Sequence, residues 1–295
     1  MKIGIAEKDG RRFLAASVND QTVDLSTLAG TVDLQRVIED ASLFSRLEDA
    51  LTGSPHVQGV GWCAPLPKPP KFLLLAGNFR AHVVESGYEA APERHLTPQF
   101  FIKPSSTVLD PEQAIPLVDE NVGLDYEAEL AVVIGKRVKN ATPANALEAV
   151  WGYTVVNDIS ERKLNTRMQP REKRSNDDFF DWLVGKWFDG SAPMGPWVVT
   201  ADEFANRNPD QIVVRAHLND EEVQNAPITA MIHSVAEAIV YISRILTLEP
   251  GDVIAMGTPS GVGMARGRML QDGDRIACEV TGIGTLRNTV RKQPA

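Results

Sequence analysis

Two acidic side chains one residue apart are the clearest chemical signal in this chain. Glu127 and Glu129 lie in the segment Leu124-Asp-Tyr-Glu-Ala-Glu-Leu-Ala-Val-Val-Ile-Gly135. Its apolar run before the glycine predicts a strand, on which alternate residues share a face. Asp125, Glu127 and Glu129 are therefore predicted to lie on one face. Carboxylates this close have raised pKa values when buried. The segment is either a solvated strand face or half of a cation site.

A second carboxylate favours the cation site. Asp158 lies in the strand-like run Trp151-Gly-Tyr-Thr-Val-Val-Asn-Asp-Ile-Ser160. An aspartate among apolar residues is costly unless it is paired or binds a metal. The alternative is a helix cap or an Asx turn. Together the acids predict a Glu/Glu/Asp site. An all-oxygen ligand set suits Mg²⁺, Mn²⁺ or Ca²⁺ better than zinc, and we expect Mg²⁺ or Mn²⁺.

A histidine and a glutamate three residues apart could move protons. His82 and Glu85 would share one face of a short helix predicted over 81–85. A glutamate beside an imidazole fixes its tautomer and raises its basicity, which is general-base chemistry. The alternative is an ordinary surface pair.

Basic residues give weaker signals. Lys186, in Gly-Lys-Trp, has no glycine-rich run before it and no Ser or Thr after it, so it is not a P-loop lysine. It could be an ordinary surface lysine. Lys103, before a proline, could be structural or at the rim of a site. The basic stretch 162–174 is interpreted as a solvated loop or as a rim that attracts acidic substrates.

Composition excludes some partners. A net charge of -9 argues against nucleic acid, which needs basic patches. No apolar run reaches the length of a membrane span, and the start lacks the apolar stretch of a signal peptide. We therefore expect a cytoplasmic protein without membrane contact. Cys63 and Cys278 have no metal spacing and are expected as buried apolar fillers.

Periodicity predicts a mainly β protein with few helices. We expect a small N-terminal domain over 1–64, a proline-rich linker over 65–70 and a catalytic domain over 71–295. The loop 86–98 is expected to be mobile. The predicted strands cover 2–7, 13–18, 71–76, 192–200, 212–218, 253–256, 275–280 and 285–291, and the predicted helices cover 32–51 and 231–246.

From about residue 72 to residue 290 the chain resembles the fumarylacetoacetate hydrolase family, because several motifs occur in the family's order. The motifs are Gly77-Asn-Phe-Arg-Ala-His-Val-Val-Glu85, Phe101-Ile-Lys-Pro104, Asp125-Tyr-Glu-Ala-Glu129, Gly152-Tyr-Thr-Val-Val-Asn-Asp-Ile-Ser160, Gly185-Lys-Trp-Phe-Asp189, Ala192-Pro-Met-Gly195 and Gly257-Thr-Pro-Ser-Gly-Val-Gly263.

The resemblance implies a role for each motif. It implies that Glu127, Glu129 and Asp158 bind a divalent metal, and that His82 and Glu85 form a catalytic dyad on a lid-like segment. It also implies that Lys186 lies near the substrate oxygens, and that Thr258 and Gly257 bind a substrate carboxylate. Asn165 occupies the position of a residue that reaches the substrate. Two positions depart from the family pattern: Asn165 replaces a longer glutamine, and Phe79 replaces a tyrosine.

The implied fold is α+β and mainly β, a mixed β-sandwich roll with a small N-terminal α/β domain. The implied reaction is metal-dependent hydrolysis of a carbon–carbon bond in a 1,3-dicarbonyl acid of the acylpyruvate type. Decarboxylation of a β-keto acid such as oxaloacetate and isomerisation of a 2-hydroxydienoate are alternatives on the same site. A non-catalytic, metal-stabilised protein is a further one.

The resemblance also implies a homodimer. The apolar strands predicted over 212–214 and 253–256 could be covered in part by the partner, or entirely within one chain.

Overall fold

The computed structural model describes residues 1–19, 21–87, 96–164, 171–205 and 207–293. Its α-helices are α1 (Ser26–Ala29), α2 (Leu34–Glu39), α3 (Ala41–Asp49), α4 (Arg80–Glu85), α5 (Asp177–Val184), α6 (Ala201–Ala205), α7 (Val235–Ile245) and α8 (Gly263–Arg266). Its strands are β1 (Lys2–Lys8), β2 (Arg11–Val18), β3 (Gln21–Asp24), β4 (His56–Val57), β5 (Gly61–Cys63), β6 (Phe72–Ala76), β7 (Gln99–Ile102), β8 (Val108–Leu109), β9 (Ala114–Leu117), β10 (Leu124–Asp125), β11 (Ala128–Ile134), β12 (Val150–Asn157), β13 (Ser160–Glu161), β14 (Ala192–Thr200), β15 (Val213–Leu218), β16 (Glu221–Pro227), β17 (Val253–Ala255), β18 (Arg275–Val280) and β19 (Gly284–Lys292).

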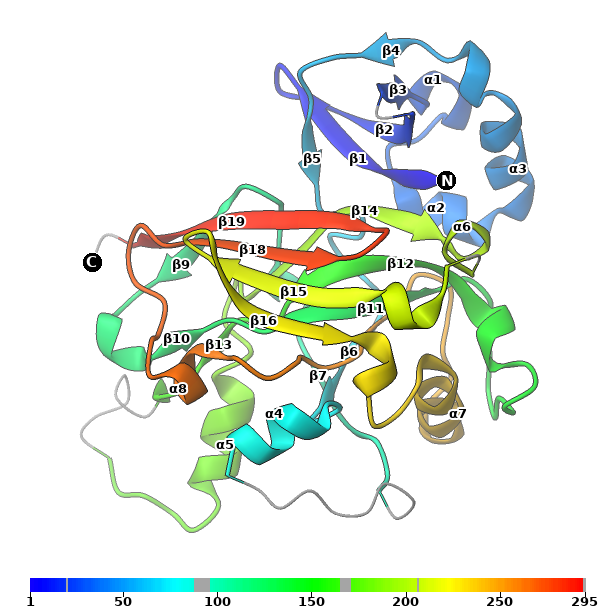
Figure 1. The fold of residues 1–295 in the computed structure, drawn as a ribbon. Helices are drawn as coiled ribbons and strands as arrows, with labels where there is room; N and C mark the ends of the chain where they lie inside the picture. The colour runs from blue at the N-terminus through cyan, green and yellow to red at the C-terminus, as the bar shows by residue number, and fades with distance from the viewer. Residues whose placement is uncertain (20, 88–95, 165–170, 206, 294–295) are drawn as a thin grey trace.

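Two sheets form most of the described fold. The longer sheet runs in the order β4-β3-β2-β1-β14-β12-β11-β17-β6-β7, with β5 beside β1 and β8 beside β14. The second sheet runs β16-β15-β18-β19-β9, and β10 and β13 form a separate pair. Figure 1 shows the second sheet lying across β11, β12 and β14. The α+β, mainly β fold class is confirmed.

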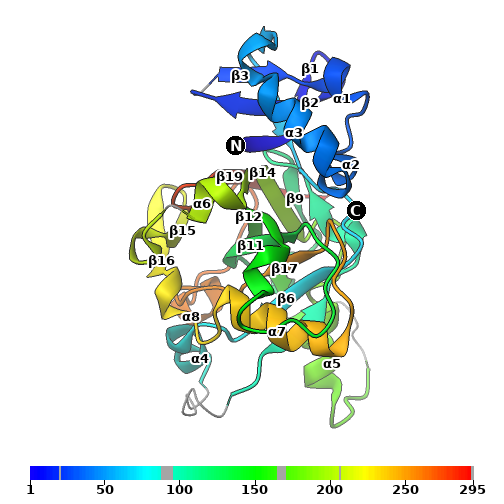
Figure 2. The same ribbon diagram turned by 90° about the vertical axis from the view of Figure 1, so that its right-hand side faces the viewer.

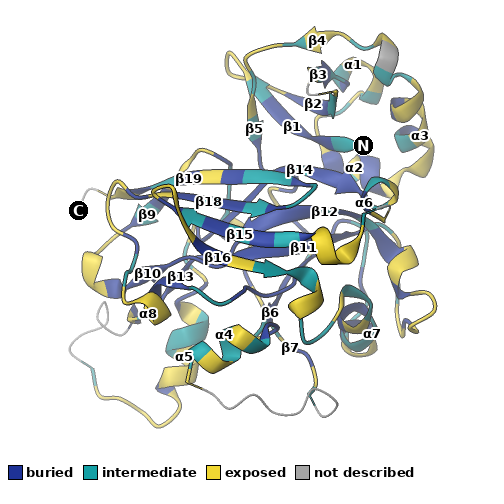
Figure 3. Cartoon of the chain, in the orientation of Figure 1, coloured by how far each residue is buried: buried dark blue, intermediate teal, exposed yellow. Residues whose placement is uncertain are grey.

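The core between the sheets explains why these strands carry so many β-branched and apolar residues. Leu130 and Val155 of the longer sheet join Val214 and Cys278 of the second sheet in one apolar cluster, all at most 1% exposed. Figure 3 shows β11, β12 and β14 as buried along nearly their whole length. A strand buried on both faces reads as a continuous apolar run, as β11 does after Glu129. The residues that follow the acids therefore fix β11 in the middle of the molecule.

The N-terminal residues lie together at one end of the molecule (Figure 2). The predicted first hairpin is confirmed by the pairing of β1 with β2, in which Lys8 lies opposite Arg11. Strand β1 also pairs with β14, through Lys2 and Val199, so the longer sheet continues across residue 64. The division into domains at 64 and 70 stays a prediction.

The single helix predicted over 32–51 is wrong. The structure has two helices, α2 and α3, which meet at Asp40. Asp40 has an extended backbone, and its side chain accepts hydrogen bonds from the N–H groups of Ser42 and Leu43. An aspartate that caps a new helix in this way competes with continuation of the preceding one. The apolar positions keep a helical period on both sides of the break, which is why the period alone did not reveal it.

Two other predicted boundaries need correction. The predicted strand over 124–135 is divided into β10 and β11, with Tyr126 and Glu127 between them. The helix predicted from Met231 begins only at Val235, because Ser234 and Glu237 form a capping box. Figure 1 shows α7 beside the end of the longer sheet.

The strands that we considered for a partner surface are covered within one chain. Val253, Ile254, Ala255 and Val214 are 0% exposed, and Ile212 is 3% exposed. They therefore give no argument for a dimer. Within the part of the chain that is described, no helix is long and apolar enough to cross a membrane.

Candidate active site

Three carboxylates meet at the ends of β11 and β12. Oxygen atoms of Glu127, Glu129 and Asp158 lie within 4.8 Å of one another, and the three residues are buried. The antiparallel register places Ala128 opposite Asn157, so the flanking acids must converge. A backbone hydrogen bond of 2.9 Å from Asp158 N to Glu127 O continues the pairing just beyond the ends of β11 and β12. The structure thus brings together the three acids that were predicted as metal ligands.

Asp125 does not belong to this cluster, so the predicted shared face of three acids is wrong. Because the strand is interrupted after Asp125, its side chain turns toward α8. It accepts hydrogen bonds from the N–H groups of Gly263 (2.6 Å) and Met264 (3.1 Å). Gly263 is required there, because a Cβ would lie 2.6 Å from Asp125 Oδ1.

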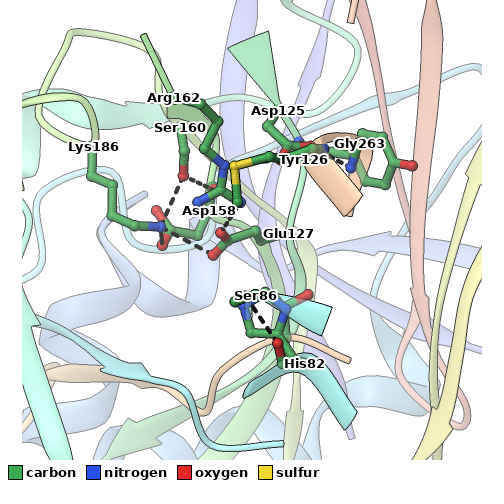
Figure 4. Close-up of polar contacts among 12 residues, drawn as sticks. His82, Ser86, Asp125, Tyr126, Glu127, Asp158, Ser160, Arg162, Lys186 and Gly263 are labelled. Carbon is green, nitrogen blue, oxygen red and sulfur yellow. Dashed lines mark hydrogen bonds and ion pairs between the residues drawn. The ribbon is translucent and has the colours of Figure 1, made fainter. Parts of the chain in front are cut away.

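Two buried lysines hold the carboxylates of the cluster, and Figure 4 shows one of them, Lys186. Lys186 Nζ lies 3.0 Å from Glu127 Oε2, 2.6 Å from Asp158 Oδ2 and 2.8 Å from Ser160 Oγ. Lys103 Nζ lies 2.6 Å from the other oxygen of Asp158. Lys186 is therefore buried in the site and is not a surface lysine, and Lys103 lies under the site and not at its rim.

Arg162 is a further residue whose place in the site was not predicted. The stretch 162–174 was interpreted as a solvated loop or as a rim that attracts acidic substrates, but the side chain of Arg162 is only 10% exposed. Its Nη2 lies 2.5 Å from Glu127 Oε1, and its Nε lies 2.9 Å from Asp125 Oδ2. Figure 4 shows it reaching between Asp125 and Glu127. Arg162 thus links Glu127 of the carboxylate cluster to Asp125, which binds the first N–H groups of α8.

The charges around the two glutamates differ, and so do their pKa values. Burial would raise the pKa of Glu127, but Lys186 and Arg162 hold it well below its ordinary value. Burial, Asp158 and Glu127 raise the pKa of Glu129 well above its ordinary value. Glu129 accepts a hydrogen bond of 2.8 Å from Gly257 N. The neutral form of Glu129 is thus favoured unless another positive charge approaches.

The pKa values of the two buried lysines also shift in opposite directions. Burial lowers the pKa of Lys103 to about 8, although Asp158 acts in the opposite direction. Burial also disfavours the charged form of Lys186, but Asp158 and Glu127 outweigh it and raise its pKa. Lys186 therefore stays an ammonium group at neutral pH.

The donor set fits a divalent cation. Four buried carboxylates, those of Asp125, Glu127, Glu129 and Asp158, face three cations, those of Lys103, Arg162 and Lys186. If all were ionised, one negative charge would be left over, and Glu129 is the one of the four that forms no ion pair among the described residues. Oxygen ligands without sulfur or imidazole are those that Mg²⁺ and Mn²⁺ prefer.

The predicted histidine pair is present on α4. His82 Nδ1 lies 2.7 Å from Glu85 Oε1, and the two side chains are 13% and 17% exposed. Glu85 Oε2 accepts a hydrogen bond of 2.7 Å from Gly261 N. The positive charge that His82 can carry helps to lower the pKa of Glu127, so the imidazole lies close to the carboxylate cluster. Figure 4 shows His82 on the side of Glu127 away from Asp125.

The glycine-rich segment 257–263 joins the pair to the cluster. Gly257 has φ +83° and donates to Glu129, while Gly261 donates to Glu85. The Thr258 hydroxyl donates to Ala128 O (3.0 Å) and accepts from Gln224 Nε2 (2.8 Å). Sequence reasoning missed Gln224, because nothing in its neighbourhood marks it. The predicted contacts of Thr258 and Gly257 with a substrate carboxylate stay predictions.

Two sequence predictions fall outside the described residues. Asn165, the candidate substrate contact, belongs to the segment 165–170. Most of the predicted mobile loop, residues 88–95, is also outside.

Comparison with known proteins shows the family to which the chain belongs. Residues 71–291 match the family model described as fumarylacetoacetate (FAA) hydrolase C-terminal. The mitochondrial oxaloacetate tautomerase fahd2 of Xenopus laevis is 32% identical over 295 residues, which cover 98% of this chain and 86% of that protein. The chain belongs to the fumarylacetoacetate hydrolase family.

Solved structures share the whole fold. A fumarylacetoacetate hydrolase from the psychrophile Exiguobacterium antarcticum superposes with a TM-score of 0.81 and 31% identity, covering 99% of this chain and 100% of that one. A maleylpyruvate hydrolase from Sphingobium sp. SYK-6, solved with manganese(II) and pyruvate, superposes with a TM-score of 0.79 and 25% identity, covering 100% of both chains. The family is enzymatic, and its members named here include hydrolases and a tautomerase.

Proposed function

We propose that the protein is a divalent-metal-dependent enzyme that cleaves a carbon–carbon bond in a 1,3-dicarbonyl acid of the acylpyruvate type by hydrolysis. The observation that carries this proposal is the His82–Glu85 pair, held by Gly261 beside a buried Glu127, Glu129 and Asp158 cluster. The similarity to a maleylpyruvate hydrolase solved with manganese(II) and pyruvate supports the substrate class.

Glu127, Glu129 and Asp158 would hold the cation. Mg²⁺ or Mn²⁺ bound there would act as a Lewis acid on the substrate's carbonyl oxygens. The cation would also favour the ionised form of Glu129, whose pKa is raised in its absence.

The histidine pair would supply the base. Because Glu85 takes the Nδ1 position, the neutral imidazole carries its proton on Nδ1 and leaves Nε2 free to accept one. Nε2 would take a proton from a water molecule, and the resulting hydroxide would attack the distal carbonyl. Cleavage then releases one acid and an enolate, and the enolate carbon takes up the proton.

Lys186 would stabilise the enolate by its charge. All three of its N–H groups are used by Glu127, Asp158 and Ser160. A direct hydrogen bond to substrate would require it to release one of these partners. Its charge acts at short range in a water-poor site, where such stabilisation is large.

Keto–enol tautomerisation of oxaloacetate is the second candidate. The tautomerase of Xenopus laevis is similar along 98% of this chain, including the N-terminal unit. The same His82 Nε2 could remove a proton from the carbon between the two carbonyl groups and return it to oxygen. No attacking water is needed for this reaction, so the geometry of the pair is compatible with it.

One assay series separates the two. The purified protein is incubated with Mg²⁺ or Mn²⁺ and with an acylpyruvate, oxaloacetate or a 2-hydroxydienoate. Release of pyruvate from the acylpyruvate supports hydrolysis, and faster enol-to-keto conversion of oxaloacetate without loss of carbon supports tautomerisation. Activity that is unchanged in excess chelator, in a protein that contains no metal, would overturn both.

A further inference from the structure

Lys103 is a fully buried cation that the proposed reaction does not use. It follows β7, and its side chain is 0% exposed. We propose that Lys103 is a positioning residue, which sets the orientation of the Asp158 carboxylate for the divalent cation. This inference rests on the proposed metal site.

The ammonium group of Lys103 is fixed in three directions. Its Nζ donates to Asp158 Oδ1 at 2.6 Å, to Ser191 O at 2.9 Å and to Ile159 O at 3.2 Å. An ammonium group has three hydrogens, so all of them are used. The backbone of Lys103 is also anchored, because its N–H donates to Phe72 O at 3.0 Å. Neither end of this side chain is free to follow a movement of Asp158.

The partners of Lys103 lie on separate segments. Ile159 and Asp158 belong to the junction between β12 and β13, whereas Ser191 directly precedes β14. Lys103 therefore ties the Asp158 carboxylate to the backbone on both sides of it. Lys186 binds the second oxygen, Oδ2, at 2.6 Å. With one cation on each oxygen, rotation of the carboxylate about its Cβ–Cγ bond would break an ion pair.

Charge and positioning predict opposite effects of removing Lys103. If Lys103 acted only through its charge, its loss would leave the cluster more negative, and a divalent cation would bind more tightly. If it holds Asp158 in place, its loss lets the carboxylate rotate, and the cation binds more weakly. Partners that orient a ligand typically contribute about 10–100-fold to metal affinity. The sign of the change therefore decides between the two roles.

The test measures binding of Mn²⁺ alone, by calorimetry, to the full chain without substrate. Lys103→Met keeps the length of the side chain and removes its donors. We expect its Mn²⁺ affinity to fall by about 10–100-fold. Lys103→Leu also removes the donors and gives the same comparison if the Met variant does not fold. Equal or tighter Mn²⁺ binding by a folded variant overturns the inference.

Lys71→Met is a matched control. Lys71 Nζ pairs with the buried Asp252 at 2.8 Å, so this variant also breaks a lysine–aspartate pair at an edge of the same sheet. Asp252 precedes β17, at the end opposite Gly257. We expect a less stable protein with unchanged Mn²⁺ affinity. A similar fall in affinity in both variants would show general destabilisation and not positioning. If the unaltered protein binds no divalent cation, the proposed function fails before this inference is reached.

Discussion

Glu85 Oε2 accepts a hydrogen bond of 2.7 Å from the backbone N–H of Gly261, a residue 176 positions later in the chain. The other oxygen of the same carboxylate binds His82 Nδ1. The orientation of the imidazole is therefore set by the glycine-rich segment and not by α4 alone. Since Gly257 in that segment also donates to Glu129, the His82–Glu85 pair and the carboxylate cluster are held by the same segment.

Replacing His82 tests the base. We expect His82→Ala to lower turnover by about 10²–10⁴-fold, which is the usual contribution of general-base catalysis. Its Mn²⁺ affinity should stay nearly constant, because Glu127, Glu129 and Asp158 are untouched. Steady-state kinetics and calorimetry measure the two quantities. Unchanged turnover with every substrate would show that the pair has been assigned the wrong role.

Glu129→Gln should separate metal binding from stability. The amide is neutral and can still accept the hydrogen bond from Gly257, so the metal-free protein should be at least as stable as the original. Stabilisation by Mg²⁺ should disappear, because one ligand loses its charge. Thermal unfolding with and without Mg²⁺ measures both effects.

Glu127→Gln is the contrasting variant. It leaves Lys186 and Arg162 with less counter-charge in a buried site. Breaking a buried ion pair from one side typically costs about 3–5 kcal/mol. We therefore expect a marked fall in the metal-free unfolding free energy, unlike that of Glu129→Gln. Equal stability of the two variants would contradict the pairing described here.

Stabilisation by metal should depend on pH through Glu129. In the folded, metal-free protein the pKa of Glu129 lies above the ordinary value of 4.5. Folding therefore favours the neutral carboxyl, and the free energy of unfolding falls as the pH rises from 4.5 through the folded-state pKa. A cation binds the ionised form and removes this cost. The increase in Tm caused by Mg²⁺ should therefore grow as the pH rises from the ordinary value of 4.5 toward the higher folded-state pKa of Glu129.

The matched control for this dependence is Glu129→Gln, in which no carboxylate titrates at that position. Its response to Mg²⁺ should be small and nearly flat over the same range. A shift that shrinks with rising pH in the unaltered protein would mean that another group controls binding.

We expect a homodimer in solution. This expectation rests on the family resemblance alone, since the apolar strands first considered for an interface are largely buried within one chain. Light scattering at micromolar concentration measures the mass directly. A mass near 32.3 kDa would show a monomer and refute this expectation.

The carboxylate cluster and the histidine pair could be predicted because their members are close in sequence. Glu127 and Glu129 do lie together, although Glu127 precedes β11 and the expected continuous strand is interrupted. The helical spacing of His82 and Glu85 placed the second pair on one face of α4. Assigning their chemistry required the family motifs. Antiparallel register then brought Asp158 beside them, as the predicted Glu/Glu/Asp set requires.

The buried cations could not be predicted in the same way. Lysine and arginine are almost never fully buried unless paired, and their partners here are distant in sequence. Lys103 binds a residue 55 positions away, and Arg162 binds residues 35 and 37 positions away. No local pattern reports such pairs. For the same reason the stretch that contains Arg162 was interpreted as a solvated loop or a substrate-attracting rim. Asp125 was likewise predicted to share a face with Glu127 and Glu129, and not to accept hydrogen bonds from the first N–H groups of α8.

The carboxylate cluster and the His82–Glu85 pair are held in place by very different parts of the fold. The acids lie on or beside β11 and β12, which are buried between the sheets, whereas the base lies on the six-residue helix α4 and is tethered through the Glu85–Gly261 hydrogen bond. A graft of residues 77–87 from a relative with another activity would therefore exchange the proton-transfer group and keep the cation cradle intact. This arrangement lets the proposed proton-transfer group change with one short segment, while the buried carboxylates and their strands stay in place.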